Sequence, residues 1–243
     1  VRHERFAARP YALANPGLRS LPVFGEMRGH DNAELILALR PSPDVVFKTW
    51  GTTMGVTPDE LAGRTGVPVV AVDAGDLGAR FPELAGSLRL MGAVLGREER
   101  AAAVVDFLET TIADLARRVA DVPEASRPSV YLGGVAFRGP HDLTSTEPAY
   151  PPFTLVGARN LARAAAAGER EPGHADVARE MIVAWDPDVV FVDLSTLQLG
   201  EGRGGLHELR TDPAYRTLTA VREGRVYGLL PYNWYTRNFG SVL

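Results

Sequence analysis

Residues 180–193 have the sequence EMIVAWDPDVVFVD, and residues 34–47 have the similar sequence ELILALRPSPDVVF. Each stretch starts with a short amphipathic helical pattern, passes through proline, which ends a helix, and continues into an apolar, β-branched run. Such a run is typical of a strand buried in a parallel sheet. The pattern recurs after about 146 positions. This spacing predicts two similar lobes rather than a solenoid, whose repeats span about 20 to 50 residues.

Further apolar, β-branched segments predict strands at residues 67–72, 129–133 and 225–230, each next to a helical pattern. Alternation of strands and helices indicates the α/β class, with two lobes that have mostly parallel central sheets. By contrast, residues 169–176 are charged and contain glycine and proline, so we expect a mobile surface loop there.

Residues 97–122 keep apolar side chains at helical spacing and predict one long helix. At 1.5 Å per residue this helix would be nearly 40 Å long, about the distance needed to join two lobes. A coiled coil is the weaker interpretation, because the apolar spacing lasts for barely three heptads. We therefore expect an N-terminal lobe at 1–96, a connecting helix at 97–122 and a C-terminal lobe at 123–243.

Composition excludes several classes of protein. The 243 residues are 45% apolar and 23% charged, with a net charge of −4, and nothing resembles the basic stripe of a nucleic-acid-binding protein. No run of about 18 apolar residues occurs that would span a membrane. Because the chain has no cysteine, disulfides and thiolate metal sites are absent. The first residues lack a signal-peptide core and the last ones look like the start of a helix, so we expect a piece of a longer chain.

Three segments carry a more specific resemblance: residues 137–147 (FRGPHDLTSTE), residues 150–153 (YPPF) with 157–160 (GARN), and residues 230–240 (LPYNWYTRNFG). Together with the repeated unit and the long helix, they resemble the helical-backbone class of substrate-binding proteins that serve importers of iron siderophores, haem and cobalamin. Within that class the chain is similar to the iron-compound subgroup. Family members have another strand–helix unit at their start, a secretion or lipoprotein signal and a longer final helix.

The resemblance implies a fold and a function. It implies that the protein is not an enzyme but captures an iron chelate, siderophore-like, in a cleft between the lobes and docks on an ABC permease. We expect an extracytoplasmic monomer, periplasmic or a cell-surface lipoprotein. No cofactor and no metal ligated by the protein itself are expected.

Ligands of open α/β sheets bind beyond the carboxyl ends of the strands, so the loops that follow strands are the candidate sites. The loop after residues 129–133 carries Arg138, His141, Ser145 and Tyr150, which offer a guanidinium for anionic oxygens, an imidazole, a hydroxyl and an aromatic wall. The alternative interpretation is a solvated turn at Arg138 and His141, with YPPF packing the lobe.

Tyr232, Asn233, Trp234 and Tyr235 follow the predicted strand at 225–230 and suit a planar organic ligand. Trp234 as a core residue is the alternative, and the two tyrosines cannot both face the ligand on an extended segment. In the N-terminal lobe, the candidates for ligand binding are Arg28, His30 and Trp50.

Two other functions compete with this one. A free metal-ion-binding protein of related architecture needs three or four His, Asp or Glu ligands, whereas the five histidines are scattered without paired spacing. A Rossmann-like enzyme is less supported, because Gly133-Gly134 after a strand lacks the rest of the dinucleotide fingerprint. Cobalamin stays open, and haem does too, with His141, Tyr150 or Tyr232 as possible axial ligands.

Overall fold

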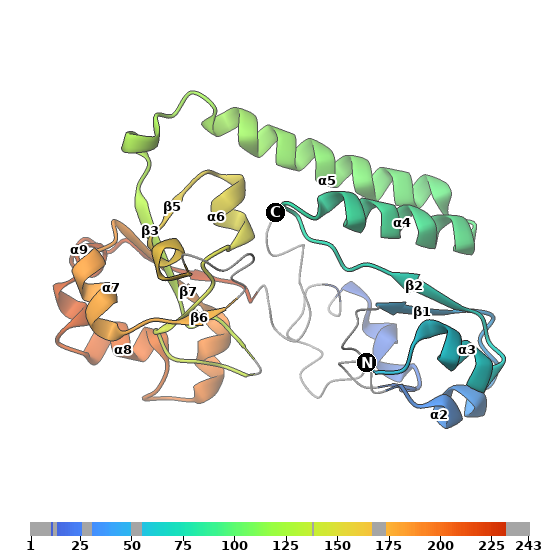
Figure 1. Ribbon diagram of the computed structural model, residues 1–243. Helices are drawn as coiled ribbons and strands as arrows, with labels where there is room; N and C mark the ends of the chain where they lie inside the picture. Colours follow the sequence, from blue (N-terminus) through green and yellow to red (C-terminus); the bar gives the residue numbers. More distant parts are fainter. Residues whose placement is uncertain are drawn as a thin grey trace. The chain divides into compact units, whose positions relative to one another are not determined.

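The computed structural model describes residues 11, 14–25, 31–49, 55–137, 139–166 and 174–231. The chain divides into two compact units, Val1–Leu108 (unit 1) and Glu109–Leu243 (unit 2). Each unit combines helices with parallel strands, which confirms the predicted α/β class (Figure 1).

Unit 1 contains the first copy of the repeated pattern. After η2 (Pro16–Ser20), the helix α2 (Ala33–Ala38) leads to the strand β1 (Val46–Thr49), and the helix α3 (Pro58–Thr65) leads to β2 (Val69–Val72). The two strands pair in parallel, with Val46 opposite Val69. Both helices pack on these strands around a small buried cluster of Ile36, Val46, Leu61 and Val67.

The helices of unit 1 begin and end where the local sequence dictates. The side chain of Asn32 accepts a hydrogen bond from the amide of Leu35 and caps α2. Thr57 caps α3 in the same way, and Pro58 follows at the first helical position. Gly66 ends α3 with a φ of 69°, a left-handed conformation that favours glycine.

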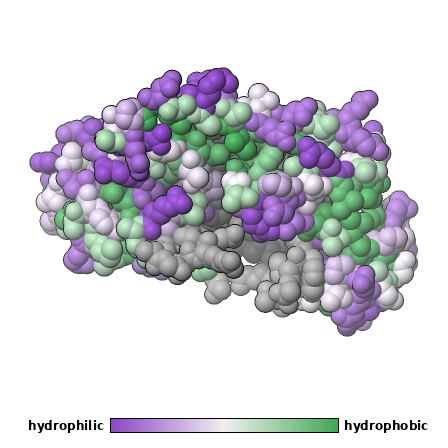
Figure 2. Space-filling view, turned by 45° about the horizontal axis from the view of Figure 1, so that its top comes forward, coloured by the Kyte–Doolittle hydropathy of each residue, from purple (hydrophilic) through white to green (hydrophobic). Residues whose placement is uncertain are grey.

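The long helix predicted at 97–122 is α5 (Glu98–Val119), which follows α4 (Phe81–Leu95) after a two-residue turn. The two helices approach closely, since a Cβ atom on Gly92 would lie 2.5 Å from the Cβ of Ala101. With 22 residues, α5 is about 33 Å long. The boundary between the two units falls within it. Phe107 of α5 is 61% exposed. Figure 2 shows patches of apolar surface between polar ones on one face of the molecule.

The sheet of unit 2 has the strand order β5–β3–β7–β8, all in parallel. Its strands are β3 (Ser129–Gly133), β5 (Arg159–Asn160), β7 (Val189–Asp193) and β8 (Val226–Leu229). The helix α7 (Arg179–Trp185) leads into β7, as α2 leads into β1. The repeated sequence pattern therefore forms the same α-to-parallel-β unit twice.

The remaining elements of unit 2 are mostly short. They are η4 (Glu124–Ser126), β4 (Ser145–Thr146), α6 (Pro151–Leu155), η5 (Leu161–Ala166), β6 (Ala175–Asp176), η6 (Leu194–Leu199), α8 (Gly205–Thr211), η7 (Tyr215–Thr217) and α9 (Thr219–Arg222).

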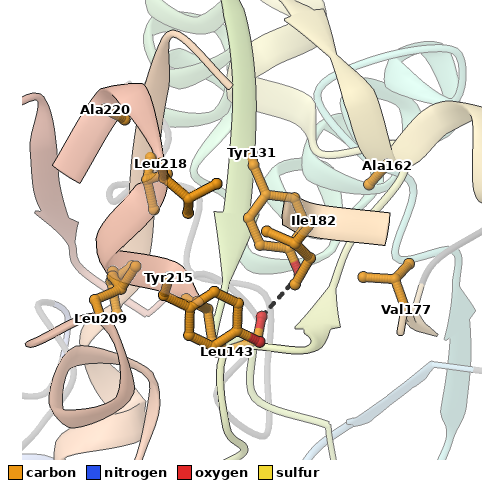
Figure 3. Packing of buried hydrophobic residues seen from close by; sticks show 11 residues of the cluster. Tyr131, Leu143, Ala162, Val177, Ile182, Leu209, Tyr215, Leu218 and Ala220 are labelled. Carbon is orange, nitrogen blue, oxygen red and sulfur yellow. Dashed lines mark hydrogen bonds between the residues drawn. The ribbon is translucent and has the colours of Figure 1, made fainter. Parts of the chain in front are cut away.

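Side chains of the central strands alternate between two buried faces. Val130 and Leu132 pack with Tyr150 and Phe153 of the α6 region. The intervening Tyr131 faces the opposite way, into the core formed with α7, α8 and α9. Figure 3 shows this core, where the Tyr131 hydroxyl donates to the carbonyl of Leu143 at 2.7 Å. Helices thus cover both faces of the sheet, as expected for an apolar parallel sheet.

The sequence Asp186-Pro187-Asp188 connects α7 to β7 in the second copy of the repeated pattern. Asp186 ends α7 in a left-handed conformation, and its carboxylate accepts bonds from the amide and hydroxyl of Thr219 at 2.6 and 2.7 Å. Asp188 accepts from the amide and hydroxyl of Ser129, both at 2.7 Å. These hydrogen bonds lower the pKa of both carboxyl groups. Those of Asp186 tie the end of α7 to the start of α9, and those of Asp188 tie the start of β7 to the start of β3.

The prediction of a surface loop at 169–176 is wrong at its end. Ala175 and Asp176 form β6, which pairs antiparallel with Ser145 and Thr146 of β4. Two-residue strands carry too little of the period-2 pattern to be recognised in a sequence. Residues 169–173 lie outside the described residues.

Candidate ligand-binding site

The segments that carry the predicted site residues of unit 2 begin at the carboxyl edge of its sheet. Gly133 at the end of β3 lies opposite Val192 of β7, and Asp193 lies opposite Leu229 of β8. The loop that follows β3 and the segment that begins after β8 therefore start from the same edge of the sheet. Both predicted site segments of this lobe, 137–150 and 232–235, belong to them.

The loop between β3 and β4 is fixed to the rest of unit 2 by side-chain hydrogen bonds. Leu143 donates its amide to Glu208 of α8 at 2.9 Å, and its carbonyl accepts from Tyr131. Thr196 of η6 donates to the carbonyl of His141 at 2.7 Å and accepts from the amide of Gly205 at 2.8 Å. The loop is therefore pre-organised by three neighbouring elements, in addition to hydrogen bonds within the loop such as that from the amide of Ser145 to the carbonyl of Asp142.

Two glycines allow this close packing. A Cβ atom on Gly133 would lie 2.5 Å from the side chain of Leu143, and Gly134 has a φ of 73° with Thr196 close to it. The Gly133-Gly134 pair thus serves contacts within the lobe.

Ser145 and His174 connect the two short strands. The Ser145 hydroxyl donates to the carbonyl of Val135 at 2.7 Å, so its oxygen accepts from Nε2 of His174 at 2.9 Å. The His174 ring stacks on Phe137 with a centroid distance of 4.2 Å and lies 5.7 Å from the ring of His141. Burial lowers the pKa of His174, the neighbouring His141 adds to this effect, and Asp176 opposes it.

Asp193 at the end of β7 lies on the same edge and is only 4% exposed. Its carboxylate accepts from the amide of Ser195 at 2.8 Å. Burial raises the pKa of this carboxyl group, although hydrogen bonds from Ser195 and Ala136 oppose the shift. Asp193 caps η6 and keeps Thr196 in reach of the loop.

Only three of the predicted site residues lie in the described part of the chain. His141 is partly exposed, and its Nε2 contacts the carbonyl of Phe137 at 2.6 Å. Ser145 is fully buried, and Tyr150 is 3% exposed in contact with Phe153, so both pack inside the lobe. Their direct contact with a ligand stays a prediction. Arg28, His30, Trp50, Arg138, Tyr232, Asn233, Trp234 and Tyr235 lie outside the described residues.

In unit 1 the segment before Trp50 is the strand β1. Lys48 on this strand is 6% exposed, and its ammonium pairs with the carboxylate of Asp31. A buried ammonium needs such a partner. The pair fixes a charged side chain of β1 in place.

Sequence reasoning missed His174, Thr196 and Glu208. Thr196 and Glu208 act through backbone atoms of a loop more than 50 residues away in the chain, which no spacing reveals. In the part of the chain that the structure describes, no three His, Asp or Glu side chains come together as a metal site. Among the same residues, no helix is both long and apolar enough to cross a membrane.

Comparison with solved structures places the fold. MolA of Haemophilus influenzae, the molybdate periplasmic binding protein of an ABC transporter, is 20% identical, with a TM-score of 0.66 over 93% of this chain and 68% of MolA. A periplasmic solute binding protein of Veillonella parvula is 20% identical, with a TM-score of 0.68 over 98% of this chain and 67% of that protein. The chain thus spans about two thirds of the length of both.

A periplasmic haem-binding protein of Pseudomonas aeruginosa is 25% identical, with a TM-score of 0.58 over 93% of this chain and 75% of that protein. No curated protein matches the sequence. The family model described as periplasmic binding protein matches residues 14–232. The chain therefore belongs to the periplasmic binding protein family, the substrate-binding proteins of ABC transporters.

Proposed function

We propose that the protein captures an iron chelate of the siderophore type between its two lobes and delivers it unchanged to an ABC permease. Family membership supports the general role, because substrate-binding proteins of this family hold a small molecule outside the cytoplasm and present it to a permease. The chelate itself is inferred from the chemistry of the predicted site. Holding and releasing a ligand needs no catalytic group, so we propose no enzymatic activity.

The observation that carries the proposal is the fixed loop between β3 and β4. Thr196 and Glu208 hold its backbone at His141 and Leu143, so little conformational entropy is lost when a ligand binds there. The segment after β8, which carries three aromatic side chains, starts from the same edge of the sheet. A fixed polar loop and aromatic side chains that follow the same sheet edge suit a charged chelate with apolar faces.

Ten of the eleven predicted site residues have a role in this proposal, and His141 has one in the alternative with haem. Arg138 and, from the N-terminal lobe, Arg28 would bind the anionic oxygens of the chelate. The rings of Trp50, Tyr232, Trp234 and Tyr235 would cover its apolar faces, while His30 and Asn233 would add hydrogen bonds. Ser145 and Tyr150, which are predicted to contact the ligand, would also support the loop from inside unit 2.

Haem is a second candidate ligand. The solved haem-binding protein of Pseudomonas aeruginosa is 25% identical to this chain over most of its length. His141 or Tyr232 would be the axial ligand in that case, since the hydroxyl of Tyr150 belongs to a residue that is 3% exposed.

The organisation around the site is part of the same proposal. We propose lobes at 1–96 and 123–243 joined by a helix at 97–122. We also propose that the protein is a monomer outside the cytoplasm, either in the periplasm or as a cell-surface lipoprotein.

Variants of the two loops test the proposal by isothermal titration with a ferric siderophore. Arg138→Ala and Trp234→Ala should each weaken binding at least tenfold, which corresponds to about 1.4 kcal/mol. Arg203→Ala is the matched control, because this exposed arginine of unit 2 lies outside both loops. Equal affinities of all three variants and the wild type would refute the assignment of the site.

A further inference from the structure

Two of the histidines that are scattered in the sequence form a pair in the part of the chain that the structure describes. His141 and His174 are 33 positions apart, yet their ring centroids lie 5.7 Å from each other, tilted by 49°. Phe137 stacks on His174 at 4.2 Å and holds that ring in place. The antiparallel pairing of β4 with β6 brings the two histidines together.

Hydrogen bonds fix the same tautomer in both rings. The partner of Nε2 in His141 is the carbonyl of Phe137, which can only accept, so this nitrogen carries the proton. The hydroxyl of Ser145 gives its only proton to Val135, so it must accept from Nε2 of His174. Neutral rings of this tautomer have a lone pair on Nδ1. The structure gives neither Nδ1 a hydrogen bond within the described residues.

This arrangement is the one that orients metal-binding histidines. An imidazole that binds a metal through one nitrogen generally donates its other N–H to a carbonyl, carboxylate or water, which sets the tautomer. The ring of His174 stacks on Phe137 and is hydrogen-bonded to Ser145, so its orientation is also set. Its side chain is 16% exposed, so an ion from solvent can reach the ring.

The separation of the rings is compatible with one shared ion. Imidazole nitrogen binds Zn²⁺ at about 2.0–2.1 Å, which puts the ring centre about 3.2 Å from the metal. Two rings at bond angles of 110–120° would then have centres about 5.2 to 5.5 Å apart. The observed 5.7 Å requires the rings to approach by a few tenths of an ångström.

We propose that His141 and His174 bind a divalent transition-metal ion of the copper, nickel or zinc type through their Nδ1 atoms. Imidazole suits these ions, whereas magnesium and calcium require oxygen ligands. No third His, Asp or Glu completes a site among the described residues, so water or donor atoms of a bound molecule fill the other positions. Ion binding by this pair does not depend on the proposed siderophore transport.

Titration of the intact chain with Cu²⁺, in a buffer without chelating groups, tests the pair. One equivalent should bind, and its electron paramagnetic resonance spectrum should show two equatorial nitrogens. His141→Gln and His174→Gln keep an N–H donor but remove Nδ1, so each should weaken binding at least tenfold and remove one nitrogen coupling. His207→Gln, on α8, is the matched control and should change neither.

Wild-type protein provides a test that does not depend on folding of the variants. Substoichiometric Cu²⁺ should broaden the imidazole NMR signals of His141 and His174 together, before that of His207. Broadening of only one of the pair, or of His207 equally, would overturn the proposal, as would full affinity in either glutamine variant. Binding of ferric siderophores is measured separately, so its failure would refute the proposed function and leave the metal pair standing.

Discussion

The two copies of the helix–proline–strand pattern have the same local structure but very different surroundings. In unit 1, β1 pairs with β2 and the buried cluster around it has four members. In unit 2, β7 lies between β3 and β8, and apolar clusters cover both faces of the sheet. A short sequence pattern thus determines the element, while residues distant in the chain determine how strongly that element is held.

Ile36 and Ile182 occupy the same position in the two copies. Replacing each of them should give the largest difference in lost stability between the two units. Both are buried, at 1% and 0% exposure, but Ile182 belongs to a cluster of eleven buried residues. Ile182→Ala should destabilise unit 2 by about 2–5 kcal/mol, because the dense cluster cannot collapse around the cavity. Ile36→Ala should destabilise unit 1 by less.

Hydrogen exchange measured by mass spectrometry reports the stability of each unit separately. The comparison would be reversed if Ile36→Ala lowered the stability of unit 1 by more than Ile182→Ala lowers that of unit 2. It would then place the more rigid core in the N-terminal half of the chain.

Substitution of Thr196 tests whether its hydroxyl holds the loop between β3 and β4 of unit 2 in place. Thr196→Val keeps the volume but removes the hydroxyl that joins the carbonyl of His141 to the amide of Gly205. We expect a loss of about 1–3 kcal/mol, because two polar backbone groups lose their partner in a buried position. Amide exchange should accelerate in residues 139–147. Thr217→Val is the control, since that exposed hydroxyl bonds only within its own turn; similar acceleration there would mean that Thr196 does not hold the loop.

Asp44 and Asp188, which precede β1 and β7, should give the smallest difference in their contributions to stability. Asp188 is bonded to Ser129, whereas Asp44 has no side-chain hydrogen bond to the described part of the chain. The pKa of Asp188 is lowered in the folded state, so its contribution is present above the unfolded value of about 3.9 and is lost as the pH falls below it. We expect about 1 kcal/mol, since the carboxylate is partly exposed.

Urea unfolding between pH 5 and pH 3 measures this contribution. With Asp188→Asn, the free energy of unfolding should decrease less between pH 5 and pH 3 than it does in the wild type. Asp44→Asn should leave this decrease unchanged. The raised pKa of Asp193 acts in the opposite direction in every variant and cancels in the comparison. If the free energy of unfolding decreases equally below pH 5 in Asp188→Asn and in the wild type, the bond to Ser129 contributes nothing measurable to stability.

Sequence patterns predicted the parallel strands at residues 129–133, 189–193 and 226–229 closely, because apolar runs next to prolines and helical periods are local signals. They did not predict β4, β6 or the contact of His141 with His174. Those features depend on two-residue strands and on side-chain bonds across 10 to 65 positions, which leave no period in the sequence. The loop that carries His141, Ser145 and Tyr150 follows β3, as the sequence predicts, but the side chains that fix it became visible only in the fold.

The central claim is that the chain captures an iron chelate of the siderophore type as an importer's substrate-binding protein. Isothermal titration of the intact chain with ferric siderophores, haem, cobalamin and bare divalent ions tests it most directly. The account predicts saturable one-to-one binding of a ferric siderophore, with haem and cobalamin weaker. Binding of haem or cobalamin alone, or of no chelate at all, would contradict it.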